Sequence, residues 1–354
     1  MSSIRPVKQR TGVDRAGAPR QGSQMRRSIQ LIGHRGARGL FPENTLAGFA
    51  GALAIGVDAI ELDVAMTSDG VVVVTHDPAL NPDQTRGPDG AWLTTPGPLI
   101  RSLPATALGG YDVGRLRPGS AAARRFPDQA PCDGARIPTL ADVLNMAPGV
   151  RFFIEMKTFP AAPGRTAPAL QMAEAVLEAV EAAGCADRTI IEAFDWRGPR
   201  HLRRLRPGLG LALLTDLRCE VQARLWRGGP RPATLARSLP HAVAAEGVAA
   251  WGPSHRTLTR TRLAEAHRLG LAVIPWTVNR PADLRRLIAW GVDGLVTDRP
   301  DLARAVLAEA GHSLAPPLAP PLAPPWPPPL APPLTPPAAR PWDPPLAPRP
   351  VRAG

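Results

Sequence analysis

The sequence predicts a closed parallel (β/α)8 barrel with a tail at each end. Between residues 30 and 312, short apolar strands alternate with helices over the length of about 250 residues that one such barrel needs. The strands are continuous apolar runs rather than alternating ones, which indicates that both of their faces are covered. Polar residues gather where the strands end, and in these barrels functional groups collect at that face.

The first elements already show this alternation. A strand is expected at 30–34, a helix at 43–55 and a strand at 59–66, and a tight Ser-Asp-Gly turn at 68–70 leads into a valine-rich strand at 71–75. The segment 77–137 is rich in Pro, Gly and Asp and has no sustained period. It predicts an irregular insertion after the third strand.

Regular alternation resumes after the insertion. Strands are expected at 151–157, 189–194, 209–214, 248–251, 271–278 and 294–297, and helices at 167–183, 197–205, 220–226, 261–269, 282–290 and 301–310. This gives nine strands, one more than the barrel needs. The surplus strand is either 248–251 or 71–75, because the turn before 71–75 is too short for a parallel crossover.

The two ends have the composition of segments outside the domain. Residues 1–29 are polar and basic without periodicity, which predicts a disordered arm. Residues 313–354 repeat Leu-Ala-Pro-Pro and favour polyproline II, as a disordered tail that is either an inert spacer or a ligand for a proline-binding domain. The barrel domain is therefore expected to span 30–312.

Charge and hydropathy exclude several classes of function. The formal net charge is +12, but residues 1–29 hold seven basic residues and one acidic residue, so no nucleic-acid-binding face is expected on the folded part. No apolar run suggests a signal peptide or a transmembrane segment. The three cysteines, Cys132, Cys185 and Cys219, lack metal-type spacing, and reduced thiols fit a cytoplasmic protein.

Paired carboxylates are the clearest chemical signal in the chain. Glu61 and Asp63 lie two apart in a predicted strand and project to the same face, where they repel each other unless a cation lies between them. A hard divalent metal ion is the physical reason to place both there. Glu155 and Lys157 are also two apart, and they either join this site or form a structural ion pair.

Further polar residues lie at other strand ends. His34 and His76 can give and take protons near neutral pH, and Arg35 and Lys157 can neutralise a phosphate. Apart from Lys8, Lys157 is the only lysine in an arginine-rich chain, so its position favours a compact ammonium. Asp298 is interpreted as a helix cap or a loop residue, and not as catalytic.

The order of these motifs resembles the glycerophosphodiester phosphodiesterase family, within the superfamily of phospholipase C-like phosphodiesterases. The resemblance extends over residues 30–305, through His34-Arg35-Gly36, Pro42-Glu43-Asn44-Thr45, Glu61-Leu62-Asp63-Val64, His76-Asp77, Ile154-Glu155-Met156-Lys157, Trp276-Thr277-Val278-Asn279 and Thr297-Asp298. It implies a distorted TIM (β/α)8 barrel that carries its insertion after His76-Asp77. One departure is Ala193 before Phe194, where the family often has serine.

The resemblance also implies roles for individual residues. Glu61, Asp63 and Glu155 would bind Ca²⁺ or Mg²⁺, and His34 and His76 would be the general acid and base. Arg35 and Lys157 would contact the phosphate, while Trp276 would line the substrate side, unless it is plain barrel packing. The implied reaction is hydrolysis of small glycerophosphodiesters to sn-glycerol 3-phosphate and an alcohol. Two alternatives are a lysophospholipid substrate and a scaffold that acts through the proline-rich tail.

Overall fold

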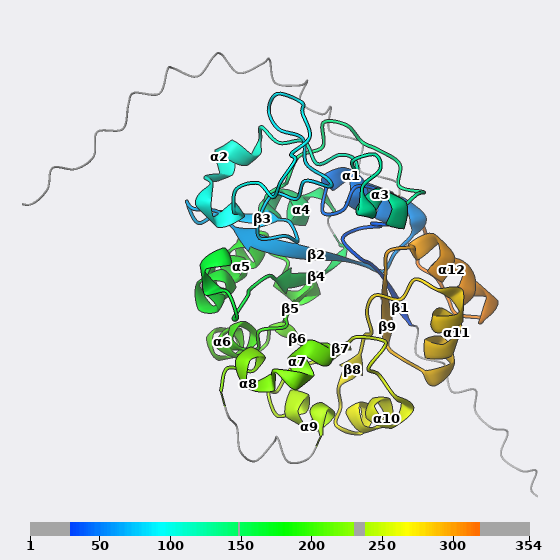
Figure 1. The fold of residues 1–354 in the computed structure, drawn as a ribbon. Helices are drawn as coiled ribbons and strands as arrows, with labels where there is room; N and C mark the ends of the chain where they lie inside the picture. The colour runs from blue at the N-terminus through cyan, green and yellow to red at the C-terminus, as the bar shows by residue number, and fades with distance from the viewer. Residues whose placement is uncertain (1–28, 148, 230–237, 319–354) are drawn as a thin grey trace, which may run out of the picture.

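The computed structural model describes residues 29–147, 149–229 and 238–318. The predicted basic arm up to residue 28 and the proline-rich repeats from residue 319 onward lie outside the described residues. Parallel strands form a ring in the described part, and helices surround it, so the predicted (β/α)8 barrel is confirmed (Figure 1).

Eight parallel strands form the ring. They are β1 (Gln30–Gly33), β2 (Ala59–Met66), β4 (Arg151–Met156), β5 (Thr189–Ala193), β6 (Gly210–Thr215), β7 (Ala250–Pro253), β8 (Ala272–Val273) and β9 (Gly294–Thr297). Their order is β8-β7-β6-β5-β4-β2-β1-β9. The two ends of this order, β8 and β9, are linked only by isolated backbone hydrogen bonds, so the ring is nearly closed. Asp293 N donates to Val273 O at 3.0 Å, and Val278 N donates to Val296 O at 2.9 Å.

The surplus strand is β3 (Val72–Val74), which pairs antiparallel with β2 and lies off the ring. The reason is the turn that the sequence places between them, in which Gly70 adopts a left-handed φ of 84°. A hairpin turn reverses the chain and cannot deliver a parallel neighbour. The other candidate is a true barrel strand, because β7 pairs parallel with both β6 and β8.

Helices alternate with the strands around the outside. The main ones are α1 (Leu46–Ile55), α4 (Leu140–Met146), α5 (Ala169–Ala182), α6 (Arg197–Leu205), α7 (Leu217–Val221), α8 (Ala223–Trp226), α9 (Leu239–Ala244), α10 (Arg260–Arg268), α11 (Pro281–Trp290) and α12 (Pro300–Glu309). The predicted helix 220–226 is wrong as a single helix, because the chain leaves helical geometry at Gln222, with ψ of 37°. The predicted strand 271–278 is shortened to β8, since Pro275 has no N–H to donate.

The core has two layers, one inside the ring and one between the strands and the helices. Side chains alternate between these two layers along each strand. Inside the ring lies a small apolar cluster: Ile32, Ala59, Phe153, Ala212, Ala250, Ile274 and Val296. The larger cluster fills the space between strands and helices. Because side chains two apart share a face of a strand, the next inward position after Ile32 is His34, after Ala59 it is Glu61, and after Phe153 it is Glu155. The predicted polar residues therefore stand on an apolar floor.

The insertion lies along one side of the mouth and has a small core of its own, which includes Leu80, Ile100 and Leu108. Its short helices are α2 (Ala105–Leu108) and α3 (Ala121–Arg125), with a 3-10 turn at Ile100–Ser102. Backbone and side-chain bonds tie it to both the first and the last barrel unit: Ala130 N donates to Leu40 O at 2.8 Å, and Arg299 Nη1 lies 2.8 Å from Asp128 Oδ2. The insertion is thereby held against the barrel mouth.

The first residues of the predicted proline-rich tail contact the barrel. Leu314 packs against the core, Arg304 Nη1 donates to Ala315 O at 2.7 Å, and Leu318 N donates to Leu53 O at 3.0 Å. Among the described residues, no helix combines the length and apolar character needed to cross a bilayer.

Two truncations separate these contacts from the rest of the tail. A chain that ends after Leu318 is expected to melt at the temperature of the full chain. A chain that ends after His312 loses the three contacts, worth about 1–2 kcal/mol together, and its Tm is expected to fall by roughly 2–6 °C. Differential scanning calorimetry of the three chains is the measurement, and an equal fall in both truncations would contradict this boundary.

Candidate active site

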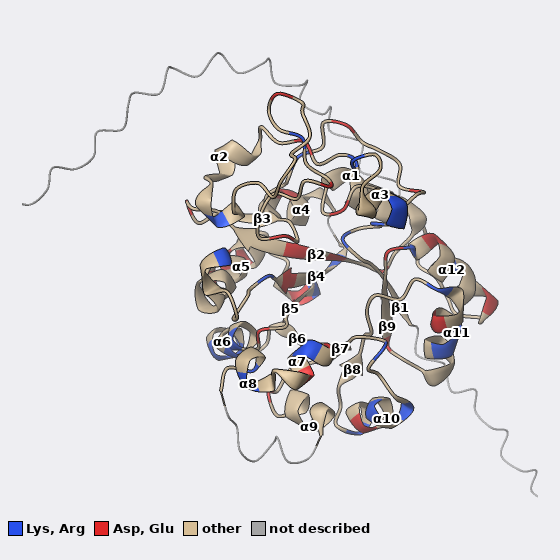
Figure 2. Ribbon diagram, in the orientation of Figure 1, with Lys and Arg blue, Asp and Glu red and all other residues tan. Residues whose placement is uncertain are grey.

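A cavity of about 470 Å³ opens at the carboxyl ends of the strands. Side chains from β2, β4, β5, β6 and β9, and from the residues that follow β1 and β8, line it. The insertion supplies part of its wall through Leu116, Ala122, Arg125 and Phe126. All eight residues singled out from the sequence lie at this mouth: His34, Arg35, Glu61, Asp63, His76, Glu155, Lys157 and Trp276. Figure 2 shows acidic positions on β2 and β4 within the ring, while many basic positions lie on the surrounding helices.

The loop after β1 adopts an unusual backbone conformation. Arg35 has φ of 51° and Asn44 has φ of 54°, the left-handed region that non-glycine residues avoid at a cost of about 1–3 kcal/mol each. In this conformation Arg35 N donates to Glu61 Oε2 at 2.9 Å. Gly33 is required beneath the loop, because a Cβ there would lie 2.1 Å from Gly36 O. The His-Arg-Gly motif thus wraps over the end of β2.

The three predicted carboxylates converge. Oxygen atoms of Glu61, Asp63 and Glu155 all lie within 4.8 Å of one another, and Asp63 and Glu155 are direct neighbours in the register of β2 and β4. All three side chains are buried. Burial and the charge of Asp63 raise the pKa of Glu61 well above its usual value, and burial raises the pKa of Glu155 to about 7.

The same carboxylates fit a hard divalent cation. Asp63 Oδ1 is fully buried and accepts no hydrogen bond, and its nearest cation is Lys157 Nζ at 3.4 Å. An unsatisfied buried carboxylate oxygen is costly, and a cation among three such groups removes both that cost and their mutual repulsion. Oxygen ligands of this kind are the ones that Ca²⁺ and Mg²⁺ take in proteins.

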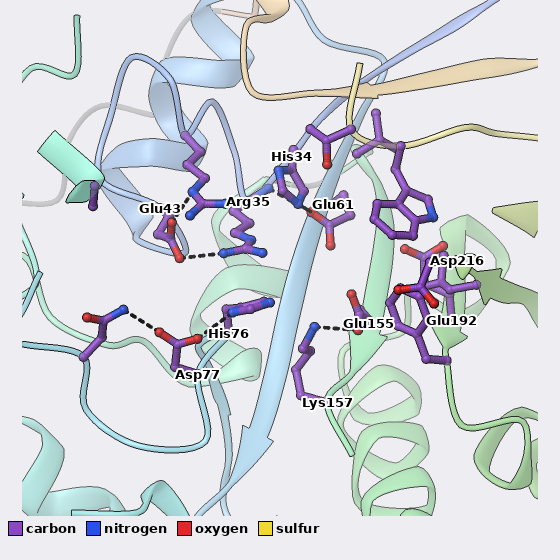
Figure 3. Close-up of a pocket in the computed structure, with 18 of the residues that line it drawn as sticks. His34, Arg35, Glu43, Glu61, His76, Asp77, Glu155, Lys157, Glu192 and Asp216 are labelled. Carbon is purple, nitrogen blue, oxygen red and sulfur yellow. Dashed lines mark hydrogen bonds and ion pairs between the residues drawn. The ribbon is translucent and has the colours of Figure 1, made fainter. Parts of the chain in front are cut away.

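Two basic side chains flank the carboxylates (Figure 3). Lys157 Nζ lies 2.7 Å from Glu155 Oε1, and Arg35 Nε lies 3.0 Å from Asp63 Oδ2. Burial would lower the pKa of Lys157, but Glu155 and Asp63 outweigh it and raise the pKa, so the ammonium stays charged. Burial likewise favours protonated Asp63, but Arg35 and Lys157 hold its pKa well below the usual value. The ion pair of Glu155 with Lys157 therefore exists, and it lies within the site.

Each predicted catalytic histidine is oriented by a carboxylate at Nδ1. His34 Nδ1 lies 2.5 Å from Asp298 Oδ1, and its Nε2 lies 3.9 Å from Glu61 Oε2. His76 Nδ1 lies 2.7 Å from Asp77 Oδ1, and Figure 3 shows its ring near Arg35 and Lys157. Burial, followed by the charges of Arg35 and Lys157, lowers the pKa of His76 to about 4. Burial also lowers the pKa of His34, against the opposing charge of Asp298.

Several residues that support the site are not among the predicted site residues. Asp298 was interpreted as a cap or loop residue, yet it contacts His34 and is itself fixed by Asn279 Nδ2, which donates to Asp298 Oδ2 at 2.6 Å. Asn44, from the Pro-Glu-Asn-Thr motif, donates from Nδ2 to Asp63 Oδ2 at 2.9 Å. Such partners come from loops, so strand periodicity alone could not pair them with the site.

One buried carboxylate was missed entirely. Glu192 on β5 lines the cavity and is the register neighbour of Glu155. Burial, with Glu155 and Asp63 nearby, raises the pKa of Glu192 well above its usual value. The sequence did offer one indication of its position. Glu192 lies two residues before Phe194, so both side chains project to the same face of the chain. Trp276 completes this wall, with its ring edge-on to Phe194 at 5.3 Å between centroids.

Comparisons with known proteins agree with this geometry. A model of the family described as "Glycerophosphoryl diester phosphodiesterase family" matches residues 34–302. An uncharacterised Bacillus subtilis protein, YqiK, is 32% identical over 278 residues, which cover 78% of this chain and 98% of that protein. A glycerophosphodiester phosphodiesterase of the same organism is 29% identical over 284 residues and is covered over 86% of its length, for 78% of this chain.

Solved structures give the same result. A crystal structure of a Silicibacter pomeroyi protein, provisionally assigned as a glycerophosphoryl diester phosphodiesterase, matches with a TM-score of 0.73 and 40% identity, over 81% of this chain and 95% of that one. An Oleispira antarctica phosphodiesterase in complex with the product sn-glycerol-3-phosphate matches with a TM-score of 0.60 and 19% identity, over 79% and 97%. The second likeness shows the shared fold alone.

Proposed function

Because this chain belongs to the glycerophosphoryl diester phosphodiesterase family and is a phosphoric diester hydrolase, we propose that it cleaves glycerophosphodiesters to sn-glycerol 3-phosphate and an alcohol. The observation that carries the proposal is the convergence of three buried carboxylates, two cations and two carboxylate-oriented histidines at one cavity. We further propose that the enzyme depends on Ca²⁺ or Mg²⁺ and acts in the cytoplasm.

Glu61, Asp63 and Glu155 would hold the metal ion. When bound, Ca²⁺ or Mg²⁺ supplies positive charge that neutralises the phosphoryl oxygens and polarises the phosphorus for attack. Without a metal ion, the three buried carboxylates repel one another, as the raised pKa values of Glu61 and Glu155 indicate. A dication relieves this repulsion, which favours metal dependence over a role of the triad as structural ion-pair partners.

Arg35 and Lys157 would bind the phosphodiester. Both stay charged despite burial, and both lie beside the carboxylates. The guanidinium can donate to two phosphate oxygens at once, while the ammonium offers a compact charge. Charge that develops on the oxygens during attack is thereby stabilised by groups already in place.

His34 and His76 would transfer the protons. One imidazole accepts a proton at Nε2 from the attacking hydroxyl or water, and the other donates one to the departing alkoxide. Contact at Nδ1 with Asp298 or Asp77 fixes the tautomer that leaves Nε2 available for this exchange. The lowered pKa values favour neutral imidazoles before substrate binds, and the anionic phosphate favours protonation of the ring that acts as the acid.

The direct test is hydrolysis of glycerophosphocholine and glycerophosphoethanolamine by the purified full-length chain. Released glycerol 3-phosphate would be measured with Ca²⁺, with Mg²⁺ and after exhaustive chelation. Release of glycerol 3-phosphate in the presence of metal is the expected result. Absence of any release with both metals would overturn the proposal.

One feature favours a second candidate substrate. The insertion lines the cavity with the apolar side chains of Leu116, Ala122 and Phe126, which can contact an acyl chain. A lysophospholipid would place such a chain against this wall. Rates on lysophosphatidylcholine and on glycerophosphocholine, compared below the micelle concentration, separate the two substrates.

Asp298 provides a prediction about positioning. Asp298→Asn keeps the size of the side chain but removes the carboxylate that fixes the imidazole of His34, and kcat is expected to fall by about 10- to 100-fold, less than for loss of the histidine itself. Without the Asp298 charge, the pKa of His34 should fall further, so the limb of the kcat–pH profile that reports His34 should move to lower pH. An unchanged profile would remove Asp298 from this role.

A further inference from the structure

Glu192 is a buried carboxylate with no assigned task in the reaction above. Its side chain projects into the cavity from β5, and only 6% of the residue is exposed. It forms no hydrogen bond or ion pair within the described part of the chain, although nearby acids such as Asp63 and Glu155 are each paired. Burial and the nearby carboxylates raise the pKa of Glu192 and favour its neutral form, whereas a ligand that brings positive charge beside it favours the carboxylate.

The residues proposed to hold the metal ion do not include Glu192. The carboxylates whose oxygens lie close enough to share an ion are Glu61, Asp63 and Glu155, and Glu192 is outside this group. The nearest basic residue, Lys157, is already engaged by Glu155 at 2.7 Å. The missing partner of Glu192 is therefore expected on a bound molecule.

The residues around Glu192 indicate which chemical group of the bound molecule would lie there. Figure 3 shows Asp216, which follows β6, beside Glu192. Phe194, two residues after Glu192, also lines the cavity, and its ring packs edge-on against that of Trp276. Asp216 accepts a bond from Cys219 N at 2.7 Å and lies 3.9 Å from the exposed guanidinium of Arg218, so its charge is partly engaged. Carboxylates next to aromatic faces form a favourable environment for an organic ammonium ion.

Basic side chains from the first barrel loop and the insertion also line the cavity. Arg38 and Arg125 line the cavity on the insertion side, and both guanidinium groups lie over the ring of Phe126, at 4.7 and 5.1 Å from its centroid. Arg38 is paired with Glu43, which also lines the cavity. An ammonium group is therefore expected to lie closer to Glu192 than to Arg125.

We propose that Glu192, with Phe194, Trp276 and Asp216, selects glycerophosphodiesters whose alcohol carries an ammonium group. This inference rests on the proposed function. Lys157 Nζ lies 5.9 Å from the centroid of Phe194, so a phosphate held by Lys157 is adjacent to Phe194. In this proposal the ammonium group, two carbon atoms beyond the ester oxygen, lies beside the carboxylate of Glu192.

The test compares a charged substrate with its uncharged isostere. Glycerophosphocholine and the 3,3-dimethylbutyl ester of glycerol phosphate differ only in a quaternary nitrogen replaced by carbon. The metal-loaded full-length enzyme is expected to cleave glycerophosphocholine with a kcat/KM at least about tenfold higher, the equivalent of 1.4 kcal/mol in transition-state binding. Glu192→Gln, which keeps the shape and removes the charge, is expected to abolish most of this preference while leaving the rate on the uncharged ester within about threefold.

The controls keep the outcomes distinct. Glu178→Gln removes the same charge from the exposed face of α5 and should leave both rates unchanged. Asp216→Asn retains a side chain able to cap α7 and should reduce the preference partially, which provides a second variant if Glu192→Gln does not fold. An equal loss on both substrates in Glu192→Gln would overturn the inference and place Glu192 at a step common to all substrates. No activity of the wild type on either ester would instead refute the proposed function.

Discussion

Replacement of His34 or His76 by alanine is expected to lower kcat on glycerophosphocholine by about 10²–10⁴-fold, the range typical of a lost general acid or base. The physical reason is that each imidazole is held at Nδ1 by its own carboxylate, so neither histidine can take over the position of the other. Steady-state kinetics with saturating metal is the measurement.

A matched control is available outside the cavity lining. His201→Ala removes a partly exposed histidine that pairs with the exposed Glu174, and its kcat should match that of the wild type. Metal binding should persist in both active-site variants, because neither histidine belongs to the carboxylate triad. Near-wild-type turnover of either variant would remove that residue from the mechanism.

Removal of the metal ion is the second change with a large expected effect. Chelation should lower kcat/KM by at least about 10³-fold, because a dication contributes several kcal/mol to stabilisation of the transition state. Ca²⁺ or Mg²⁺, added back separately, should restore the rate, and the comparison identifies the preferred ion. Activity that survives exhaustive chelation would refute the metal assignment.

Glu61→Gln tests the same site by stability rather than by turnover. In the metal-free chain, Glu61 is destabilised as a carboxylate by burial and by Asp63, so its neutral isostere should leave Tm unchanged or raise it. Gln retains an oxygen that can accept from Arg35 N. The rise in Tm that metal gives to the wild type should be lost in the variant, whereas Glu178→Gln should keep it. A full metal-induced rise in Glu61→Gln would exclude Glu61 as a ligand.

Most of the site residues that were predicted correctly followed from the alternation of side chains along the strands. The inward face of β2 follows from alternation alone, and the coincidence of Glu61 with Asp63 made a metal site the simplest physical explanation. Alternation also placed Glu155 and Lys157 on one face of β4. The resemblance to a family then joined these strands with His34 and His76, which spacing alone does not bring together.

Contacts that depend on loop conformation were not predictable in the same way. The partnership of Asp298 with His34 spans 264 residues and relies on the nearly closed ring that brings β9 beside β1. The pairing of Asn44 with Asp63 depends on a left-handed residue in a loop, for which Asn is favoured but not diagnostic. Glu192 was visible in the alternation, but one acidic residue in an apolar strand gave no indication of its partner.

The left-handed loop after β1 has a consequence for the order in which the enzyme assembles. Arg35 and Asn44 reach their strained conformations through bonds to Glu61 and Asp63, which are supplied by the next strand in the chain. Before β2 is in place nothing repays the strain, and the loop has no reason to hold the imidazole of His34 over the cavity. Catalytic activity should therefore appear only after β1 and β2 have paired, because the loop that positions His34 depends on contacts with β2.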